Sequence, residues 1–418
     1  MARAVMLEDT LPQPRSWRRI LPLVGPGLVV MLADTDAGSI ITAAQSGAQQ
    51  GYKLLLLQVL LIPILYIVQE LTVRLGLVTG RGHGELIRER FGAGWAWLSV
   101  STLAVACVGA LITELSGMAG VAQLFGVPVW LMMAGTVACI VIVVLTGSYR
   151  SVERISVCFG LFELAFLGVA FHAGPDPRQI AIDITHVPFA DKDFLYLVAA
   201  NIGAVIMPWM IFYQQSAVVD KGMKAHHLKV ARWDTAIGAV VTQLIMAAVL
   251  VATAATIGRE NSAQPLDDVP QIAAALTPAL GYTVGRVVFA LGISGAALVA
   301  TIVVSLTAAW GLGEVTGYKR SLEHRPSEAP WFYGIFTVLL ILSALLVGSG
   351  VPLVRLSVAV EVLNALLLPI VLGFLYQLAR KALPERYRLR GWYAWVAGII
   401  ILLTAGFGLV TGLAGIIG

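Results

Sequence analysis

Apolar segments long enough to cross a lipid bilayer follow one another along almost the whole of this chain. A helix needs about 20 apolar residues to cross the hydrocarbon layer of a membrane. Segments of this kind, separated by charged loops, occur at 21–48, 53–77, 95–124, 128–147, 154–173, 195–219, 233–257, 283–310, 331–349, 352–379 and 391–416. The sequence therefore predicts an all-α membrane protein with about eleven transmembrane helices.

The composition excludes a soluble fold. Hydrophobic residues make up 58% of the chain and charged residues only 12%, whereas a soluble domain carries roughly 25% charged residues. No linker rich in Ser, Pro or charge divides the chain, so we expect a cytoplasmic segment over 1–20 and a single transmembrane domain over 21–418. The three cysteines lie far apart in apolar runs and indicate no metal motif. The basic residues do not gather on one face, so we do not expect nucleic acid as a partner.

The distribution of Lys and Arg predicts the orientation, because these residues concentrate in cytoplasmic loops. If the N-terminus is cytoplasmic, most of the 28 basic residues fall on the cytoplasmic side. The exceptions are Lys53, Arg178, Lys192, Arg259, Arg286 and Arg355. We therefore expect a multi-pass protein of the plasma membrane, with its N-terminus in the cytoplasm, that works as a monomer.

Two of the predicted helices contain residues that interrupt a helix near mid-depth. The first contains Asp34, Asp36 and Gly38, and the sixth contains Pro208. Glycine weakens a helix by about 1 kcal/mol relative to alanine, and proline removes a backbone donor and clashes with the preceding turn. Each of these two segments is predicted to be a break in its helix.

The spacing of the two breaks predicts an internal repeat. They lie five spans apart, and an odd number of spans in each half inverts the second half in the membrane. Transporters built from such inverted repeats bind their substrate between two broken helices near the midplane. The first repeat would cover 21–173 and the second 195–379, with 391–416 as an extra helix.

Ionisable residues inside a membrane span are costly, and they mark functional sites. We expect Asp36, among unwound backbone carbonyls, to bind a cation; the alternative is a protonated or salt-bridged structural residue. Asp34 would face away on an intact helix, and unwinding would bring it back. Glu114 and Glu361 each stand in a span without other charges. Each could line a hydrated path or pair with a backbone group.

Other polar residues carry weaker signals. Glu70 lies near a cytoplasmic helix end, where we interpret it as structural, with gating through Arg74 four residues on as the alternative. The histidines form no motif with a second His or Cys at helical spacing. No nucleophile–base pair and no His-Glu-x-x-His motif is present, so we do not expect an enzyme.

Several stretches of the sequence resemble the NRAMP family of divalent metal transporters. The more specific ones are Gly25-Pro26-Gly27, Asp36-Ala37-Gly38-Ser39, Gly51-Tyr52-Lys53-Leu54-Leu55, Gln69-Glu70-Leu71 and 85–92. Weaker similarity runs through 150–154, Met207-Pro208, Asp234 and Pro369. The resemblance implies a LeuT-like architecture, transport of a divalent metal ion by alternating access, and no cofactor.

The resemblance also implies the site. It places the metal among Asp36, Ser39, Ala204, Met207, Trp209 and Glu361. It places Asp34, Glu70, Glu114 and Gln215 around the site or along the pathway.

The chain departs from the family pattern at several of these positions. The family's Asp-Pro-Gly-Asn has Ala37 and Ser39 in place of Pro and Asn, and its Met-Pro-His has Trp209 in place of His. One additional residue follows Pro208, so Trp209 could lie nearer the ligating position than Met207. The remaining departures are Gln215 for a second His, Leu111 for an Asp of the third helix, and Glu361 for a Gln of the tenth helix.

These departures predict magnesium rather than a softer metal. The titratable groups of the family's proton path are missing, so proton coupling should be weak or absent. Hard oxygen ligands suit Mg²⁺, whereas a thioether favours transition metals; Ser39 leaves room and Glu361 adds hard charge. The substitutions are most like the NRAMP-related magnesium transporter branch, with Mn²⁺ also carried.

Two other transporters remain as alternatives. One is a proton-coupled Mn²⁺/Fe²⁺ importer, which would use Met207 as a ligand and Glu114 or Asp36 for the proton. The other is an amino-acid carrier of the same fold, which ranks lower because Asp36 would repel the substrate carboxylate.

Overall fold

The computed structural model describes residues 26–145, 149–260, 266–350 and 352–417, and every regular element in these ranges is a helix. The predicted segment 1–20 and residues 21–25 of the first predicted helix, Gly25 included, lie outside the described residues. The first half contains α3 (Pro26–Asp34), α4 (Ala37–Gln50), α5 (Leu55–Thr79), α6 (His83–Phe91), α7 (Ala93–Phe125), α8 (Val129–Leu145), α9 (Tyr149–Gly160), η2 (Leu161–Leu164), α10 (Ala165–His172) and α11 (Pro177–Thr185). The second half contains α12 (Lys192–Val205), α13 (Pro208–Asp220), η3 (Ala225–His227), α14 (Leu228–Ala255), α15 (Ile257–Glu260), α16 (Val269–Leu280), α17 (Tyr282–Thr316), α18 (Pro330–Gly348), α19 (Leu353–Lys381) and α20 (Gly391–Ile417).

The helices account for the predicted spans. Within the described residues, 9 helical stretches are long and apolar enough to cross a membrane, and α3 with α4 forms a further span bent by 47°. The apolar helix α8, at 17 residues, corresponds to the fourth predicted span. The prediction of an all-α protein with about eleven membrane helices is thus confirmed. The sequence analysis did not predict the short helices α6, α11, α15 and α16 in the connections.

Both predicted breaks are present, and each follows from local chemistry. Asp36 adopts an extended conformation and caps the first turn of α4, as aspartate commonly does at a helix N-terminus. Met207 is likewise extended, and Pro208 occupies the first turn of α13, where its missing N–H costs nothing. Each break therefore ends one half-helix and begins another.

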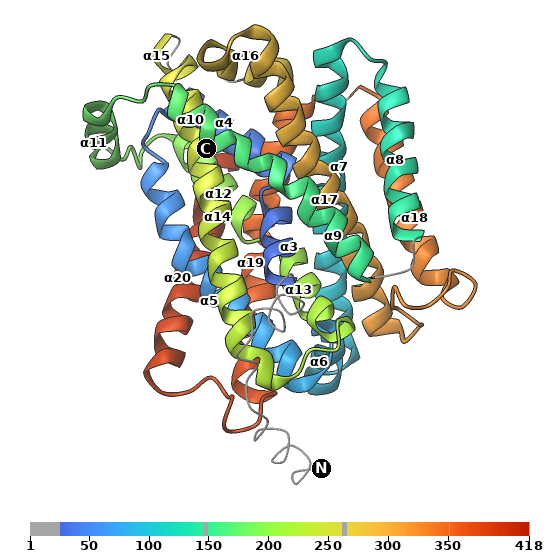
Figure 1. The fold of residues 1–418 in the computed structure, drawn as a ribbon. Coiled ribbons are helices and arrows are strands. Elements are labelled where there is room, and N and C mark those ends of the chain that lie inside the picture. The colour runs from blue at the N-terminus through green and yellow to red at the C-terminus, as the bar shows by residue number, and fades with distance from the viewer. Residues whose placement is uncertain (1–25, 146–148, 261–265, 351, 418) are drawn as a thin grey trace.

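The four half-helices lie inside the bundle (Figure 1). We call the end that carries α6 the basic end, and the end that carries α11, α15 and α16 the opposite end. The half-helices α3 and α13 lie toward the basic end, whereas α4 and α12 lie toward the opposite end. The half-helix α4 packs against α14, and α12 packs against α19 and α20. The breaks therefore lie in the interior between the two ends.

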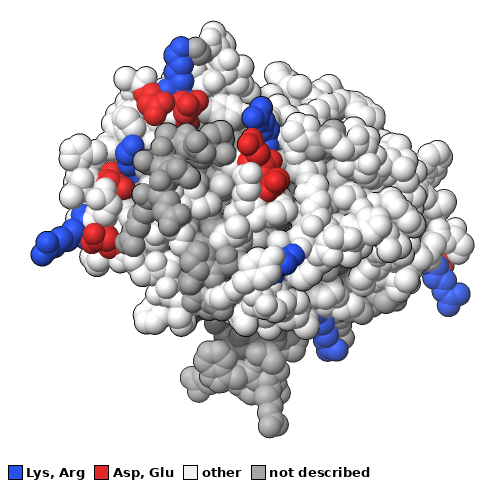
Figure 2. All heavy atoms as spheres, turned by 90° about the horizontal axis from the view of Figure 1, so that it is seen from above, with Lys and Arg blue, Asp and Glu red and all other residues white. Residues whose placement is uncertain are grey.

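The two ends differ in charge. Arg81, Arg88, Lys221, Lys319 and Arg320 lie at or near the basic end, on or beside α6, α13 and α17. Figure 2 looks down on the opposite end, where most of the visible surface is uncharged and acidic side chains form small groups beside basic ones. This asymmetry follows the predicted pattern, and the orientation of the chain in a cell stays a prediction.

Candidate functional site

Asp36 lies at the centre of the break between α3 and α4. Its Oδ1 atom accepts a hydrogen bond from the backbone N–H of Ser39 at 2.6 Å, whereas its Oδ2 atom has no hydrogen-bond partner. The residue is fully buried. One oxygen thus caps the half-helix, and the other is buried without a partner.

Ser39 joins the first break to the sixth helix. Its hydroxyl donates a hydrogen bond to the carbonyl oxygen of Ala204, at 2.9 Å, in the last turn of α12. The two breaks therefore face each other, and Asp36, Ser39 and Ala204 lie together.

Glu114 reaches the same half-helix from α7. Its Oε2 atom accepts a hydrogen bond from the backbone N–H of Ala37 at 3.0 Å. Two carboxyl groups, those of Asp36 and Glu114, therefore lie at the N-terminus of α4, where the partial positive charge of a helix favours anions. Glu114 therefore contacts the break directly.

Glu361 approaches the first turn of α4 from α19. Its Oε2 atom accepts a hydrogen bond from the Asn364 amide at 2.9 Å, and its Oε1 atom has no partner. A methyl group on Gly38 would collide with that Oε1 atom and displace the carboxyl group. The small size of Gly38 thus lets the third buried acid approach α4 closely.

Met207 and Trp209 face each other at the second break. The indole N–H of Trp209 donates to the Met207 sulfur at 3.1 Å, and both side chains are fully buried. The thioether therefore accepts one hydrogen bond, which engages one of the two sulfur lone pairs and makes it a weaker metal ligand.

Two further acids lie beside the break on the α3 side. Asp34 is the last residue of α3, and neither of its oxygens has a hydrogen-bond partner. Glu163, in η2, lies beside the Thr35 hydroxyl and near enough to Asp34 and Asp36 to experience their negative charges. Neither of its oxygens accepts a hydrogen bond of good geometry. The sequence analysis missed Glu163, although an acid inside the apolar span 154–173 is itself a signal.

Five buried acids lie around the first break without a basic side chain as partner. We call them the central acids: Asp34, Asp36, Glu114, Glu163 and Glu361. Among the described residues, no ion pair involves any of them. In the same part of the chain, no three His, Cys, Asp or Glu side chains converge closely enough to hold a metal by themselves. A cation here would also need ligands from carbonyls, hydroxyls or water.

Glu70 and Gln215 lie away from the break, toward the basic end. Glu70 forms ion pairs with Arg74 at 2.6 Å and with Arg232 at 2.8 Å. The amide of Gln215 donates to the carbonyl of Arg81 at 2.9 Å, and its oxygen lies 3.0 Å from Nδ1 of His83. Neither residue contacts the central acids, so a role for either would concern the pathway.

Comparison with known families gives one match that covers most of the chain. The Nramp family, described as natural resistance-associated macrophage protein-like, matches residues 27–414. The divalent metal cation transporter MntH of Acidiphilium cryptum is 27% identical over 420 residues, covering 96% of this chain and 92% of that protein. The MntH protein of Bradyrhizobium diazoefficiens is 26% identical over 309 residues, covering 69% and 67% of the two chains.

Solved structures show the same fold. The manganese transporter of Eremococcus coleocola, in complex with an aromatic bis-isothiourea compound, superposes with a TM-score of 0.76 at 20% identity, covering 98% of this chain and 90% of that one. A nucleobase–cation symporter in a closed conformation superposes with a TM-score of 0.60 at 14% identity, covering 94% and 91%.

Proposed function

This chain belongs to the Nramp family, and on that premise we propose that it carries Mg²⁺, and Mn²⁺ with it, across the membrane by alternating access. It is a transporter and not an enzyme, and the metal ion is its substrate rather than a cofactor. The proposed ligands are Asp36, Ser39, Ala204 and Glu361, with Met207 and Trp209 at the second break.

The observation that carries this proposal is the set of buried carboxylate oxygens without a partner. Asp36, Glu361, Asp34 and Glu163 each have at least one such oxygen. An isolated ionised carboxylate is very costly to bury unless it is paired or coordinates a metal. A divalent cation between the two breaks would offset this cost, and MntH relatives are named as divalent metal cation transporters.

The choice of Mg²⁺ rests on the hardness of the available ligands. Magnesium binds oxygen ligands and usually keeps several of its waters. Asp36 and Glu361 offer carboxylate oxygens, whereas the Met207 sulfur is held by the Trp209 indole. This donor set favours a hard, partly hydrated ion over a soft one.

We propose weak or absent proton coupling, because Leu111, Trp209 and Gln215 replace titratable residues of the family. The second candidate is a proton-coupled manganese importer. The observation that favours it is the position of Glu114 and Asp36 together at the N-terminus of α4. When a cation binds to one of two adjacent carboxyl groups, the proton that it displaces can be accepted by the other.

We also propose that the basic end faces the cytoplasm and that the chain works as a monomer. The concentration of Lys and Arg at that end supports the orientation. Under this orientation α3 and α13 are the cytoplasmic half-helices.

The test of function is uptake into proteoliposomes, with Mg²⁺ and Mn²⁺ supplied separately and a pH-sensitive dye trapped inside. We expect Mg²⁺ to enter without acidification of the lumen. Entry of Mn²⁺ with acidification, together with exclusion of Mg²⁺, would establish the second candidate instead.

Asp36→Ala tests the site. We expect this variant to lose uptake while keeping its expression level and its elution profile in detergent. The matched control is Glu323→Ala, because Glu323 is an exposed acid outside the site. Metal uptake by Asp36→Ala at normal expression would remove Asp36 from the site.

A further inference from the structure

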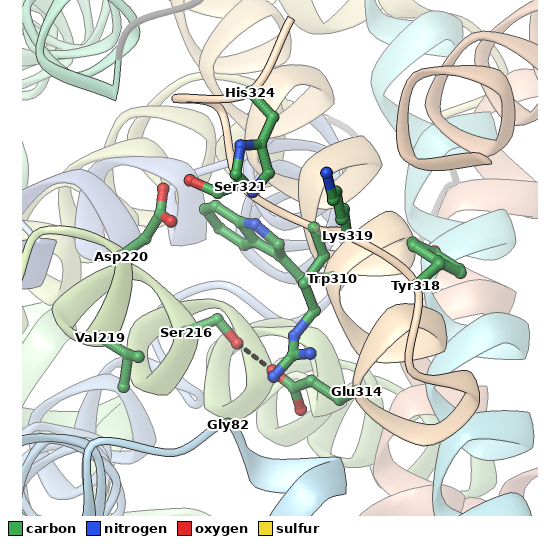
Figure 3. A pocket seen from close by; sticks show the side chains of 11 residues that line it. Gly82, Ser216, Val219, Asp220, Trp310, Glu314, Tyr318, Lys319, Ser321 and His324 are labelled. Atoms are coloured by element: carbon green, nitrogen blue, oxygen red, sulfur yellow. Dashed lines mark hydrogen bonds between the residues drawn. The ribbon is translucent and has the colours of Figure 1, made fainter. Parts of the chain in front are cut away.

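Glu314 joins three elements at the basic end. It lies near the end of α17, and its Oε1 atom accepts a hydrogen bond from the Ser216 hydroxyl of α13 at 2.5 Å. Its Oε2 atom accepts a hydrogen bond from the backbone N–H of Gly84, in the first turn of α6, at 2.8 Å. Figure 3 shows the Ser216 hydroxyl pointing at this carboxyl group. We call this arrangement the Glu314 clasp.

The clasp holds the half-helix that the second break separates from α12. The backbone at Ile206 and Met207 leaves the helical conformation, so α13 has no helical hydrogen-bond ladder to fix its angle to α12. Its far end contacts the segment 81–84, and α13 also packs against α5 and α17. His83 packs edge-on against Phe212 at 4.9 Å between ring centroids and contacts Gln215.

A pocket borders the clasp at the basic end. It has a volume of about 260 Å³, and its lining includes Asp220, Trp310, Lys319 and His324 (Figure 3). Glu314 and Ser216 also line it. The Glu314 clasp therefore forms part of the pocket wall beside α13. An outward rotation of α13 would have to separate Ser216 from Glu314.

We propose that Glu314 is a positioning residue for transport: its carboxylate fixes α13 in the closed position at the basic end, and release of Ser216 and Gly84 accompanies opening on that side. This inference rests on the proposed alternating access. Glu314, which is not one of the central acids, would then determine how often the basic end opens.

Gly82 provides a test that the geometry itself suggests. A methyl group on Gly82 would collide with the Glu314 carboxylate. The backbone of Gly82 has φ −72° and ψ 165°, which any residue adopts. Gly82→Ala should therefore displace the carboxylate without straining its own backbone. Gly94→Ala is the matched control, because nothing lies within 4 Å of a methyl group at that position.

The experiment is hydrogen–deuterium exchange of the full chain in lipid nanodiscs without added metal. Exchange reports the local opening of individual segments. We expect amides of 208–220 to exchange about tenfold faster in Gly82→Ala and Glu314→Ala, since the loss of two such bonds is worth at least the 1.4 kcal/mol that corresponds to tenfold. Amides of 192–205 and those of the Gly94→Ala variant should match the wild type.

Two results would overturn the proposal. One is exchange in 208–220 that is unchanged in both variants. The other is faster exchange in all helices, which would show that Glu314 only stabilises the fold. Neither result depends on metal uptake, so failure of the proposed function and failure of the clasp can be told apart.

Conservative variants add a graded readout. Glu314→Gln keeps an acceptor oxygen but loses the charge, and bonds to a charged group are roughly twice as strong as neutral ones. Ser216→Ala removes one of the two bonds and keeps the other. Both should give exchange rates in 208–220 between those of the wild type and Glu314→Ala. In uptake assays, Glu314→Ala should raise the apparent KM for metal entering from the opposite end about threefold, because fewer molecules are open there.

Discussion

Buried acids at the centre of the molecule and buried acids at its basic end differ in what surrounds them. At the centre, Asp34, Asp36 and Glu361 keep oxygens without a partner. At the basic end, Glu70 is held by two arginines and Glu314 by a hydroxyl and a backbone N–H. These residues are of the same chemical type and equally buried, yet Asp34, Asp36 and Glu361 keep unpaired oxygens whereas Glu70 and Glu314 have partners for both oxygens.

This difference distinguishes acids that bind a ligand from acids that hold helices together. A satisfied buried acid connects helices, and its removal leaves its partners without compensation. An unsatisfied buried acid destabilises the protein by itself and persists where a ligand completes it. Substitutions in the two regions should therefore change stability in opposite directions.

Glu70→Ala should have the largest effect on stability. It leaves Arg74, whose side chain is 8% exposed, as a buried charge without its partner. Removing one partner of a buried ion pair costs about 3–5 kcal/mol, which a denaturant titration in detergent would measure. The control is Glu385→Ala, because Glu385 forms an exposed pair with Arg390 and should cost less than about 1 kcal/mol. Equal losses of stability in the two variants would show that burial of the Glu70 ion pairs does not add to the stability of the basic end.

Acid should weaken the basic end through His83. Burial lowers the pKa of His83 from 6.5 to about 4, and its Nε2 atom has no partner. The unfolded chain therefore binds more protons between these values, so stability is present above pH 6.5 and is lost as the pH falls toward 4. The expected loss between pH 7 and 5 is about 2 kcal/mol.

The measurement is the pH dependence of the free energy of unfolding, compared with that of His83→Gln. The variant removes the titrating group, so its slope between pH 7 and 5 should be shallower. Parallel curves for the two proteins would show that His83 does not contribute this dependence.

Glu361→Gln should move stability the other way. It removes a buried charge but keeps an oxygen that can accept from Asn364. We expect the metal-free protein to be as stable as the wild type or more stable. Mg²⁺ should bind at least tenfold more weakly, about 1.4 kcal/mol, in calorimetric titrations. A loss of stability like that of Glu70→Ala would show that Glu361 holds the fold rather than the ion.

Ser39→Asn should have the smallest effect. The longer side chain would fill space between Asp36 and Ala204, where the serine hydroxyl now bonds the Ala204 carbonyl. We expect the ratio of Mg²⁺ to Mn²⁺ uptake to fall about threefold, which corresponds to well under 1.4 kcal/mol. An unchanged ratio in competition uptake would count against the size argument.

The sequence predicted the elements that local chemistry decides. Both breaks were predicted because Asp36 and Pro208 act within one turn of their own helices. The bond between Glu114 and the Ala37 N–H joins residues 77 positions apart, and it depends on how α7 packs against α4. Such a contact has no local sequence signal, so Glu114 could be predicted only as a residue that lines a path or pairs with backbone.

Other parts of the site could not be predicted, because they depend on the exact register and length of the helices. The resemblance implied that Gln215 lies around the site or along the pathway; it follows the second break by two turns and lies against Arg81 and His83. The predicted eighth span ended at residue 310, whereas α17 continues to Thr316. That additional length places Glu314 against Ser216, a contact that an apolar pattern does not encode.

The hydrogen bond between Trp209 and the Met207 sulfur has a consequence for a cell that lives among toxic metals. Cadmium and copper ions bind sulfur ligands, and the Met207 thioether at the second break accepts a hydrogen bond from the Trp209 indole N–H. If the chain carries Mg²⁺ as proposed, this bond weakens the thioether as a ligand for such soft ions. Trp209→Phe removes this hydrogen bond and should make cells that express the protein more sensitive to cadmium. Growth on plates with graded cadmium concentrations would measure this sensitivity.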